Sequence, residues 1–292
     1  MSRASLLLLS LLAGCSGAAR PIVVGSKNFT EQLILGEILS QFLEARSVPV
    51  VRRLNLEGTF ICHRAILSGD LDVYVEYTGT ALAAILKEPV VPDPQVVLQK
   101  VKAEYEKRFG LSWGPALGFN NTFAMVMRRK HAESIGVRTL SDLRPHAGAL
   151  RTGFGYEFLE REDGYRGLTQ AYGLDFGARP KEMTLQLIYQ ALSQEQVDLV
   201  GGNATDGLID ALDLVALEDD RHFFPPYDAA PVFRPDAARR YPALLEVLQE
   251  LGGRIDEKVM RALNRAVDSE RRTPAQVARE FLKKLRPPTP GA

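Results

Sequence analysis

Short apolar runs alternate along the chain with amphipathic stretches. One such run, at 71–75, is rich in valine and tyrosine, and a Thr-Gly-Thr turn separates it from an apolar helical stretch at 81–86. The same alternation extends over most of the chain. It predicts strands at 21–25, 48–54, 71–75, 116–127, 150–153 and 197–201, and helices at 31–46, 59–67, 93–109, 158–172, 185–192 and 205–212. Strands that alternate with helices indicate βαβ units, a parallel sheet and the α/β fold class.

Beyond about residue 226 the pattern predicts helices only, at 242–251, 257–267 and 274–285. A helical tail without strands must pack on a sheet formed elsewhere in the chain. The segment 65–72 also resembles the segment 191–198 in sequence. This repeat favours two similar α/β lobes, and coincidence between two common helix–strand sequences is the alternative. We expect lobe one at 20–120 plus 226–292, and lobe two at 121–225.

Two helix starts carry capping signals. Thr30 precedes the helix expected at 31–46, and its hydroxyl is a suitable N-cap, with Glu31 in the first turn. Asp93 and Pro94 have the types expected for the N-cap and the first helical position of the next long helix.

The first residues carry the features of an export signal. Arg3 precedes a short apolar segment at 4–12, which is too short to cross a bilayer as a helix. The sequence Leu-Ala-Gly-Cys that ends at Cys15 resembles a bacterial lipobox, whose cysteine is lipidated and becomes the mature N-terminus. An ordinary signal peptide is the alternative. We expect a signal peptide with lipobox at 1–15 and an exported protein, periplasmic or at the cell surface, with a lipid anchor on Cys15. Cys62 then has no disulfide partner and is expected in the core.

The charge balance and the scattered histidines argue against several function classes. The 36 basic residues equal the 36 acidic ones, which disfavours a nucleic-acid partner. The four histidines show no metal-ligand spacing, and no Gly-x-Ser-x-Gly or phosphate-binding Gly-Lys-Thr motif occurs. Asp219 and Asp220 are adjacent, but neighbouring residues of an extended segment point apart, so they make a poor acid–base pair. We therefore expect no enzyme activity, no metal and no cofactor.

The strand that leads to Tyr77 ends in a turn that opens a helical pattern. Free backbone N–H groups at the start of a helix attract anions, whereas the face of an aromatic ring attracts cations. One short segment, 77–80, therefore has features suited to both ends of a zwitterion. The simpler alternative is that Tyr77 is a core residue.

Several stretches of the chain occur in an order typical of one protein family. They are Gly-Ser-Lys-Asn-Phe-Thr-Glu-Gln at 25–32, Glu-Tyr-Thr-Gly-Thr at 76–80, Gly-Phe-Asn-Asn-Thr at 118–122, and further matches at 157–161, 205–207 and 219–227. Each is weak alone, but the ordered set covers nearly the whole mature chain. The sequence resembles the quaternary-ammonium-binding proteins of osmoprotectant ABC importers, which bind glycine betaine, choline, carnitine or proline betaine. The resemblance implies a type II periplasmic-binding-protein fold, with the ligand in a cleft between two α/β lobes.

The resemblance also implies which residues bind the ligand. The full set is Lys27, Gln32, Phe60, Tyr77, Thr80, Asn121, Phe123, Arg161, Asn203 and Tyr227. Within it, Tyr77 and Tyr227 match tyrosines of the family's aromatic cage for the cation. Lys27, Thr80 and Arg161 match positions that face the ligand carboxylate. Gln32 and Asn121 are implied to lie near the pocket, and Phe60 to line it.

The implied cage departs from the family pattern at two positions. Phe123 stands where the family usually has tyrosine, and it keeps a ring but loses a hydroxyl. Asn203 stands where the family often has another tyrosine, and it contributes no ring. The departures put glycine betaine itself in doubt as the ligand and favour a smaller or more polar cage.

The implied function is capture of a quaternary ammonium solute and its delivery to an ABC permease with its ATPase. We expect a monomeric protein held at the membrane by its lipid. The alternatives are a binding protein for a different betaine such as ergothioneine, and a ligand sensor that takes no part in transport. The simpler alternative is that three of these residues contact no ligand. Lys27 would then be an exposed lysine, Arg161 part of a solvated charge cluster, and Tyr227 a residue that packs in a loop.

Overall fold

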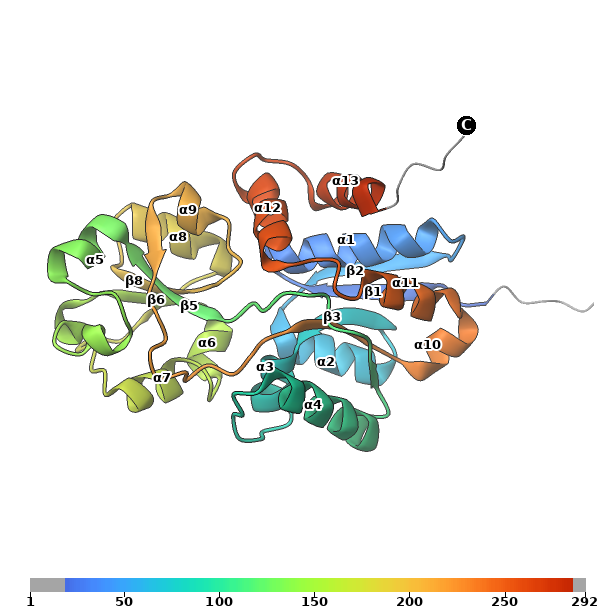
Figure 1. Cartoon of the computed structure of the whole chain (residues 1–292), viewed down its shortest axis with the longest axis horizontal. Helices are drawn as coiled ribbons and strands as arrows, with labels where there is room; N and C mark the ends of the chain where they lie inside the picture. Colours follow the sequence, from blue (N-terminus) through green and yellow to red (C-terminus); the bar gives the residue numbers. More distant parts are fainter. Residues whose placement is uncertain (1–18, 286–292) are drawn as a thin grey trace, which may run out of the picture.

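The computed structural model describes residues 19–285, and its strands form two separate mixed sheets (Figure 1). The first sheet contains β1 (Ile22–Lys27), β2 (Val50–Leu56), β3 (Val73–Tyr77), β4 (Ser112–Trp113) and β10 (Ala229–Phe233), in the order β2-β1-β3-β10-β4. The second contains β5 (Phe123–Arg128), β6 (Thr152–Phe154), β7 (Lys181–Glu182), β8 (Leu199–Asn203) and β9 (Leu214–Ala216), in the order β7-β6-β8-β5-β9. In each sheet three parallel strands are followed by an antiparallel one, β10 or β5.

Helices surround both sheets. Those before β5 are α1 (Thr30–Glu44), α2 (Gly58–Ser68), α3 (Thr78–Thr80), the π-helix η1 (Ala81–Ile85) and α4 (Pro94–Phe109). Those around the second sheet are α5 (Arg129–Ile135), α6 (Tyr156–Glu160), α7 (Tyr165–Tyr172), α8 (Leu185–Ser193), α9 (Leu208–Ala211) and the 3-10 turns η2 (Ser141–Leu143) and η3 (Ala147–Ala149). The last helices are α10 (Pro235–Arg240), α11 (Ala243–Leu251), α12 (Glu257–Asp268) and α13 (Pro274–Leu285).

The first sheet is covered on both faces, as its buried strand β3 shows. Side chains alternate between the faces of a strand. Val73, Val75 and Tyr77 belong to a core formed with α1 and the C-terminal helices, while Tyr74 belongs to a second core formed with α2, η1 and α4. Cys62 of α2 lies in this second core, is fully buried and is a free thiol, as predicted.

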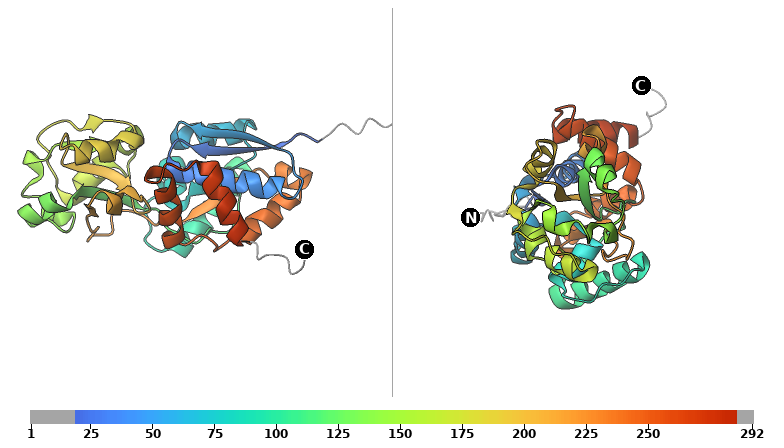
Figure 2. Two further views of the ribbon diagram at one scale, coloured as in Figure 1. Left: turned by 90° about the horizontal axis from the view of Figure 1, so that it is seen from above. Right: turned by 90° about the vertical axis from the view of Figure 1, so that its left-hand side faces the viewer.

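The helix–strand repeat seen in the sequence is present in both halves of the structure. β3 follows α2 and β8 follows α8, at the sequence offset that relates 65–72 to 191–198. The strand ends Tyr77 and Asn203 are therefore equivalent positions. Two similar α/β units lie next to each other in Figure 1 and in the left view of Figure 2.

Two extended segments connect the units and run antiparallel to each other. One leads from β4 to β5 and the other from β9 to β10 (Figure 1). Asn120 and Asp228 form a bridge between them, and the Asn121 amide donates to the Tyr227 carbonyl at 3.0 Å. The chain thus passes twice through one narrow region, and this region is where the units meet.

Several sequence predictions are wrong in detail. The region after 226 is not purely helical, because β10 lies inside the first sheet between β3 and β4. The strand expected at 116–127 begins only at Phe123. Thr30 is not an N-cap: Phe29 holds that position, Thr30 begins α1, and its hydroxyl donates to Asp268 at 2.6 Å. The Asp93 cap is confirmed, since its carboxylate accepts from the amides of Gln95 and Val96.

Candidate functional site

The carboxyl ends of β1 and β3 hold a buried ion pair. Parallel strands end at the same edge of a sheet, which is where ligands bind in open α/β folds. Lys27, the last residue of β1, places its Nζ atom 2.5 Å from Glu76 Oε1 of β3 and 2.9 Å from Thr59 Oγ1 of α2. Lys27 is only 3% exposed. The interpretation of Lys27 as an ordinary exposed lysine is therefore wrong.

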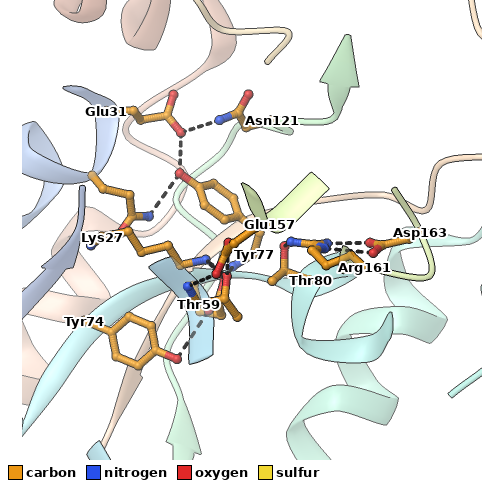
Figure 3. A network of polar contacts seen from close by, with 12 residues as sticks. Lys27, Glu31, Thr59, Tyr74, Tyr77, Thr80, Asn121, Glu157, Arg161 and Asp163 are labelled. Carbon is orange, nitrogen blue, oxygen red and sulfur yellow. Dashed lines mark hydrogen bonds and ion pairs between the residues drawn. The ribbon is translucent and has the colours of Figure 1, made fainter. Parts of the chain in front are cut away.

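Tyr77 joins a hydrogen-bond network around the buried Glu31. The Tyr77 hydroxyl donates to Glu31 Oε1 at 2.6 Å and accepts from Gln32 Nε2 at 3.0 Å (Figure 3). Asn121 also donates to Glu31, at 2.8 Å, from the segment that connects the units. The other carboxylate oxygen accepts from Thr205 of the second unit. Burial raises the pKa of Glu31 above its ordinary value, and its hydrogen bonds oppose the shift.

Arg161 connects the second unit to the turn after β3. Its guanidinium pairs with Asp163 through two hydrogen bonds, at 2.8 and 2.5 Å, and donates to Thr80 Oγ1 at 3.3 Å. The Tyr227 hydroxyl donates to the same Asp163 carboxylate at 2.6 Å. Arg161 is only 4% exposed, so it is not part of a solvated charge cluster.

Aromatic rings lie against both buried cations. The Lys27 Nζ atom is 5.1 Å from the centre of the Tyr77 ring, and the Arg161 Cζ atom is 5.1 Å from the centre of the Phe123 ring. The rings of Phe123 and Tyr227 meet edge to face with centres 5.5 Å apart. These distances are within the range of cation–π attraction.

The turn at 78–80 is tied to the segment that carries Tyr227. The Thr78 hydroxyl donates to the Pro226 carbonyl, and the Thr78 amide donates to the Asp228 carbonyl, both at 3.0 Å. A Cβ atom at Gly79 would lie 2.7 Å from the Tyr227 ring, so only glycine permits this approach. The amide of Thr78 is therefore occupied, and the Thr80 hydroxyl of the same turn lies next to Arg161.

The structure brings most of the predicted residues together, places Asn203 next to one of them and leaves Phe60 apart. Lys27, Gln32, Tyr77 and Asn121 belong to one connected group, and Thr80, Phe123, Arg161 and Tyr227 belong to the adjoining one. Asn203 is partly buried and is the partner of Phe123 in the register of β8 and β5. Phe60 is 38% exposed on α2 and has no ring contact among the described residues.

Sequence reasoning missed the acidic residues of this site. Glu31 and Glu76 lie inside the quoted motifs, and Asp163 is two residues after Arg161. Glu157 was noted only as part of a motif, yet its carboxylate accepts from Thr59 across the two units. The signal available was an acidic residue adjacent to each candidate cation or hydroxyl, but such neighbours are also typical of solvated surface charges.

Three further features concern other kinds of site: the Asp219–Asp220 pair, metal-binding clusters and membrane-spanning helices. Asp219 accepts from the amides of Phe223 and Phe224, whereas Asp220 accepts from the amide of Ser141, so the two carboxylates point to different partners as predicted. Residues 19–285 hold no group of three or more His, Cys, Asp or Glu side chains placed to bind a metal ion. Within the same range no helix is long and apolar enough to cross a membrane.

A surface groove of about 440 Å³ lies between α12 and α13. Its walls come from both helices and include Leu263, Val277 and Phe281. None of the ten predicted ligand-binding residues lines it, so it is separate from the site at the junction of the units.

Comparison with known proteins gives one consistent family. The model of the substrate-binding domain of the ABC-type glycine betaine transport system matches residues 20–284. The ergothioneine transport permease/ergothioneine binding protein EgtU of Helicobacter pylori is 38% identical over 267 residues, 91% of this chain, but this chain spans only 48% of that relative's length. The carnitine transport binding protein OpuCC of Listeria monocytogenes is 35% identical over 279 residues, with 94% of this chain and 90% of that protein covered.

A solved structure gives the same result for the fold. A crystal structure described as a glycine betaine/carnitine/choline ABC transporter is 34% identical, with a TM-score of 0.74, and the match covers 90% of this chain and 98% of that one. This similarity and the two mixed sheets confirm the two-lobed α/β periplasmic-binding-protein fold implied by the sequence. The chain belongs to the family of substrate-binding domains of ABC-type glycine betaine transport systems.

Proposed function

We propose that this protein captures a small quaternary ammonium solute between its two units and delivers it to an ABC permease with its ATPase. One observation carries the proposal. The rings of Phe123 and Tyr227 meet at the junction of the units and lie against Arg161, and the ring of Tyr77, in the adjoining group, lies against Lys27. A quaternary ammonium group uses the same attraction, because it has no N–H to donate and is held by ring faces and methyl contacts.

The charges of the site suit a zwitterion. Lys27 is balanced by Glu76 and Arg161 by Asp163, so the cations bring little net charge to the junction. A zwitterionic ligand, which carries one cation and one carboxylate, adds no net charge to the junction either. The Nε and Nη2 atoms of Arg161 pair with Asp163, and its Nη1 atom lies beside the Thr80 hydroxyl, where both can face a ligand carboxylate. We assign the ligand carboxylate to Arg161, Thr80 and Lys27, with Gln32 and Asn121 beside it and Phe60 at the rim.

Two ligand classes remain, and each has its own support. Glycine betaine, carnitine and choline are named in relatives that cover nearly the whole chain. Ergothioneine, a betaine with a thiol-bearing ring, is favoured by the relative of 38% identity and by the replacement of two family tyrosines by Phe123 and Asn203. A polar Asn203 side chain beside Phe123 in the sheet would leave room for a ring that a full tyrosine cage excludes. No catalysis is proposed for any of these ligands.

Ligand entry requires the units to separate. Tyr77, Arg161 and Tyr227 are at most 4% exposed, so a solute from outside cannot reach them in the arrangement seen here. We propose that lobe one comprises 20–120 plus 226–292 and lobe two 121–225, and that the paired segments around Asn120 and Asp228 act as the hinge between them.

Titration of a ligand panel tests the proposal. Glycine betaine, carnitine, choline and ergothioneine would be titrated calorimetrically into the wild type and into Tyr77→Ala, Tyr227→Ala and Arg161→Ala. We expect each tyrosine change to weaken binding of the preferred ligand by about 1–3 kcal/mol, through lost cation–π attraction and lost burial. Arg161→Ala should weaken ligands with a carboxylate far more than choline, which has none.

An exposed tyrosine of α6 provides the control for these binding measurements. Tyr156→Ala removes a tyrosine that is 60% exposed on α6, and it should bind as the wild type does. If Tyr77→Ala and Tyr227→Ala bind every member of the panel as tightly as the wild type, the ligand does not lie against these rings.

We also propose that the protein is exported and anchored by lipid on Cys15, and that it acts as a monomer. The support for export and the lipid anchor is the Leu-Ala-Gly-Cys motif, which lies outside the described residues. In a bacterial host, Cys15→Ser should abolish labelling with a fatty-acid analogue and move the protein from the membrane fraction to the soluble one, or leave it unprocessed. A Ser variant that is labelled and fractionates like the wild type contradicts the anchor.

A further inference from the structure

One carboxylate crosses from the second unit to the first and ends at the start of a helix. Glu157 belongs to α6, and its Oε1 atom accepts from the Thr59 amide at 2.5 Å while Oε2 accepts from the Thr59 hydroxyl at 3.1 Å. Thr59 lies in the first turn of α2, which belongs to the first unit. Figure 3 shows Glu157 next to Thr59 and close to Lys27.

Helix α2 lacks a capping side chain of its own. The first amides of a helix have no partner within it, and the helix dipole favours a negative charge there. The residue at the N-cap position is Glu57, whose side chain makes no capping hydrogen bond. Glu157 of the other unit therefore provides the hydrogen-bond acceptor that an N-cap side chain usually provides within the helix itself.

Gly58 is shaped for this contact. Its φ angle is +66°, and a Cβ atom there would lie 2.2 Å from Glu157 Oε1. Any other residue at this position would be strained and would also push the carboxylate away. The glycine and the glutamate thus form a matched pair across the junction, on elements far apart in sequence.

The contact continues into the proposed ligand site on both sides. On the first unit, the Thr59 hydroxyl also accepts from Lys27 Nζ, which pairs with Glu76. On the second unit, Arg161 follows Glu157 by one helical turn and reaches Thr80. The segment 157–161 therefore touches the first unit at two points, Thr59 and Thr80.

We propose that Glu157 is a positioning residue for ligand retention: its carboxylate caps α2 across the junction and thereby holds α6, with Arg161, against the first unit. This inference rests on the proposed function, because it concerns how long a captured ligand stays between the units. Glu157 itself is not assigned to the ligand. Glu157 affects the equilibrium between joined and separated units, and we therefore expect its loss to change the rate at which the ligand dissociates.

The test uses three single variants, a double variant that combines Gly58→Ala with Glu157→Ala, and a matched control, all in the full chain. Glu157→Ala removes the cap, Glu157→Gln keeps an acceptor but removes the charge, and Gly58→Ala displaces the carboxylate from the other side. Glu160→Gln removes an exposed charge from the same helix and should behave as the wild type. Stopped-flow release of whichever of glycine betaine, carnitine, choline and ergothioneine binds the wild type gives the dissociation rate. Small-angle scattering without ligand gives the compactness of the protein.

We expect Glu157→Ala to speed release by roughly 10- to 100-fold, as for the loss of a hydrogen bond to a charged group, with a much smaller change in the association rate. Glu157→Gln should lie between Glu157→Ala and the wild type. Gly58→Ala should act in the same direction, and the double variant should be no worse than the poorer single one, because both changes break one contact. Without ligand, Glu157→Ala should have a larger radius of gyration than the wild type.

Two results overturn the inference. The first is a Glu157→Ala protein with a lower melting temperature but wild-type release and compactness, which reduces the contact to local stability. The second is additive effects of the Gly58 and Glu157 changes on release. If no member of the panel binds the wild type, the proposed function fails separately. Scattering then still decides the inference: expansion of Glu157→Ala supports the cross-unit contact and an unchanged radius refutes it.

Discussion

The two buried cations at the junction are each paired with a carboxylate, and these acidic partners are hard to predict from the sequence. The family resemblance implies that Lys27 and Arg161 face the ligand, and both are almost fully buried. Lys27 pairs with Glu76 of the neighbouring strand β3, and Arg161 pairs with Asp163, two residues further along the chain. A buried cation is tolerated only with such a partner. From sequence alone an acid near a base is far more often a solvated surface pair, so the pairing requires the three-dimensional contacts.

The residue on which most elements converge is Glu31, and its pH dependence can be measured. Its two oxygens accept from Tyr77, Asn121, Thr205 and Asn264, which come from four separate segments. Glu31→Gln leaves at least one amide donor facing an NH₂ group. We expect it to lower the free energy of unfolding by about 1–3 kcal/mol, the cost of a buried unsatisfied group.

The sign of the pH effect follows from the raised pKa of Glu31. The folded protein binds this proton more tightly than the unfolded chain does. The contribution of Glu31 to stability is therefore fully present below its ordinary pKa of 4.5 and is lost as pH rises through the folded value. Glu31→Gln removes this dependence, so its deficit should be larger at pH 5 than at pH 8 in chemical unfolding. A deficit that grows with pH contradicts a raised pKa for Glu31.

Among the elements, β10 shows where hydrophobic patterning fails. The run Ala-Ala-Pro-Val-Phe at 229–233 is apolar, but a proline in its middle argues against a central strand. The strand nevertheless lies between β3 and β4. On the β4 side only Val232 and Phe233 are in register with Trp113 and Ser112, and the Pro231 carbonyl accepts from the Gly114 amide at 2.8 Å. Because β4 is so short, the missing N–H of Pro231 costs the sheet little.

Elements with long periodic patterns were predicted well. The expected helices at 31–46, 93–109 and 274–285 match α1, α4 and α13 to within two residues at each end. The short elements β4, β7, β9, α5 and α10 were not predicted. A strand of two or three residues carries too few side chains to show a period, so its pairing depends on the sheet that is already formed.

The molecule as a whole follows the repeat of helix and strand that the sequence shows twice. Each unit builds three parallel strands from local βαβ order and receives its antiparallel fourth strand from beyond a connecting segment. Resemblance to a family correctly implied two α/β units, which periodicity alone only favoured. What neither provides is the contact surface between the units, because it is formed by residues far apart in the chain, such as Gly58 and Glu157.

The division into lobes can be tested by excision, because the two connecting segments lie next to each other. Asn120 and Asp228 are bridged, so a short Gly-Ser linker from 120 to 226 can replace the whole second unit. With the join made from 120 to 226, where the proposed boundary lies, the remaining protein keeps all five strands of the first sheet and the helices on both its faces. We expect it to show α/β circular dichroism and one cooperative unfolding transition, with no ligand binding, since Phe123 and Arg161 are gone.

The reciprocal fragment supplies the control. Residues 121–225 alone contain the complete second sheet, β7-β6-β8-β5-β9, and should also fold. Both pieces lose the buried contacts of the junction, including those of Tyr77 and Tyr227, so each should be less stable than the intact protein. Two pieces that stay unfolded separately but fold when mixed would show that the junction is part of one shared core, and the proposed boundaries at 120 and 226 would then not separate independent lobes.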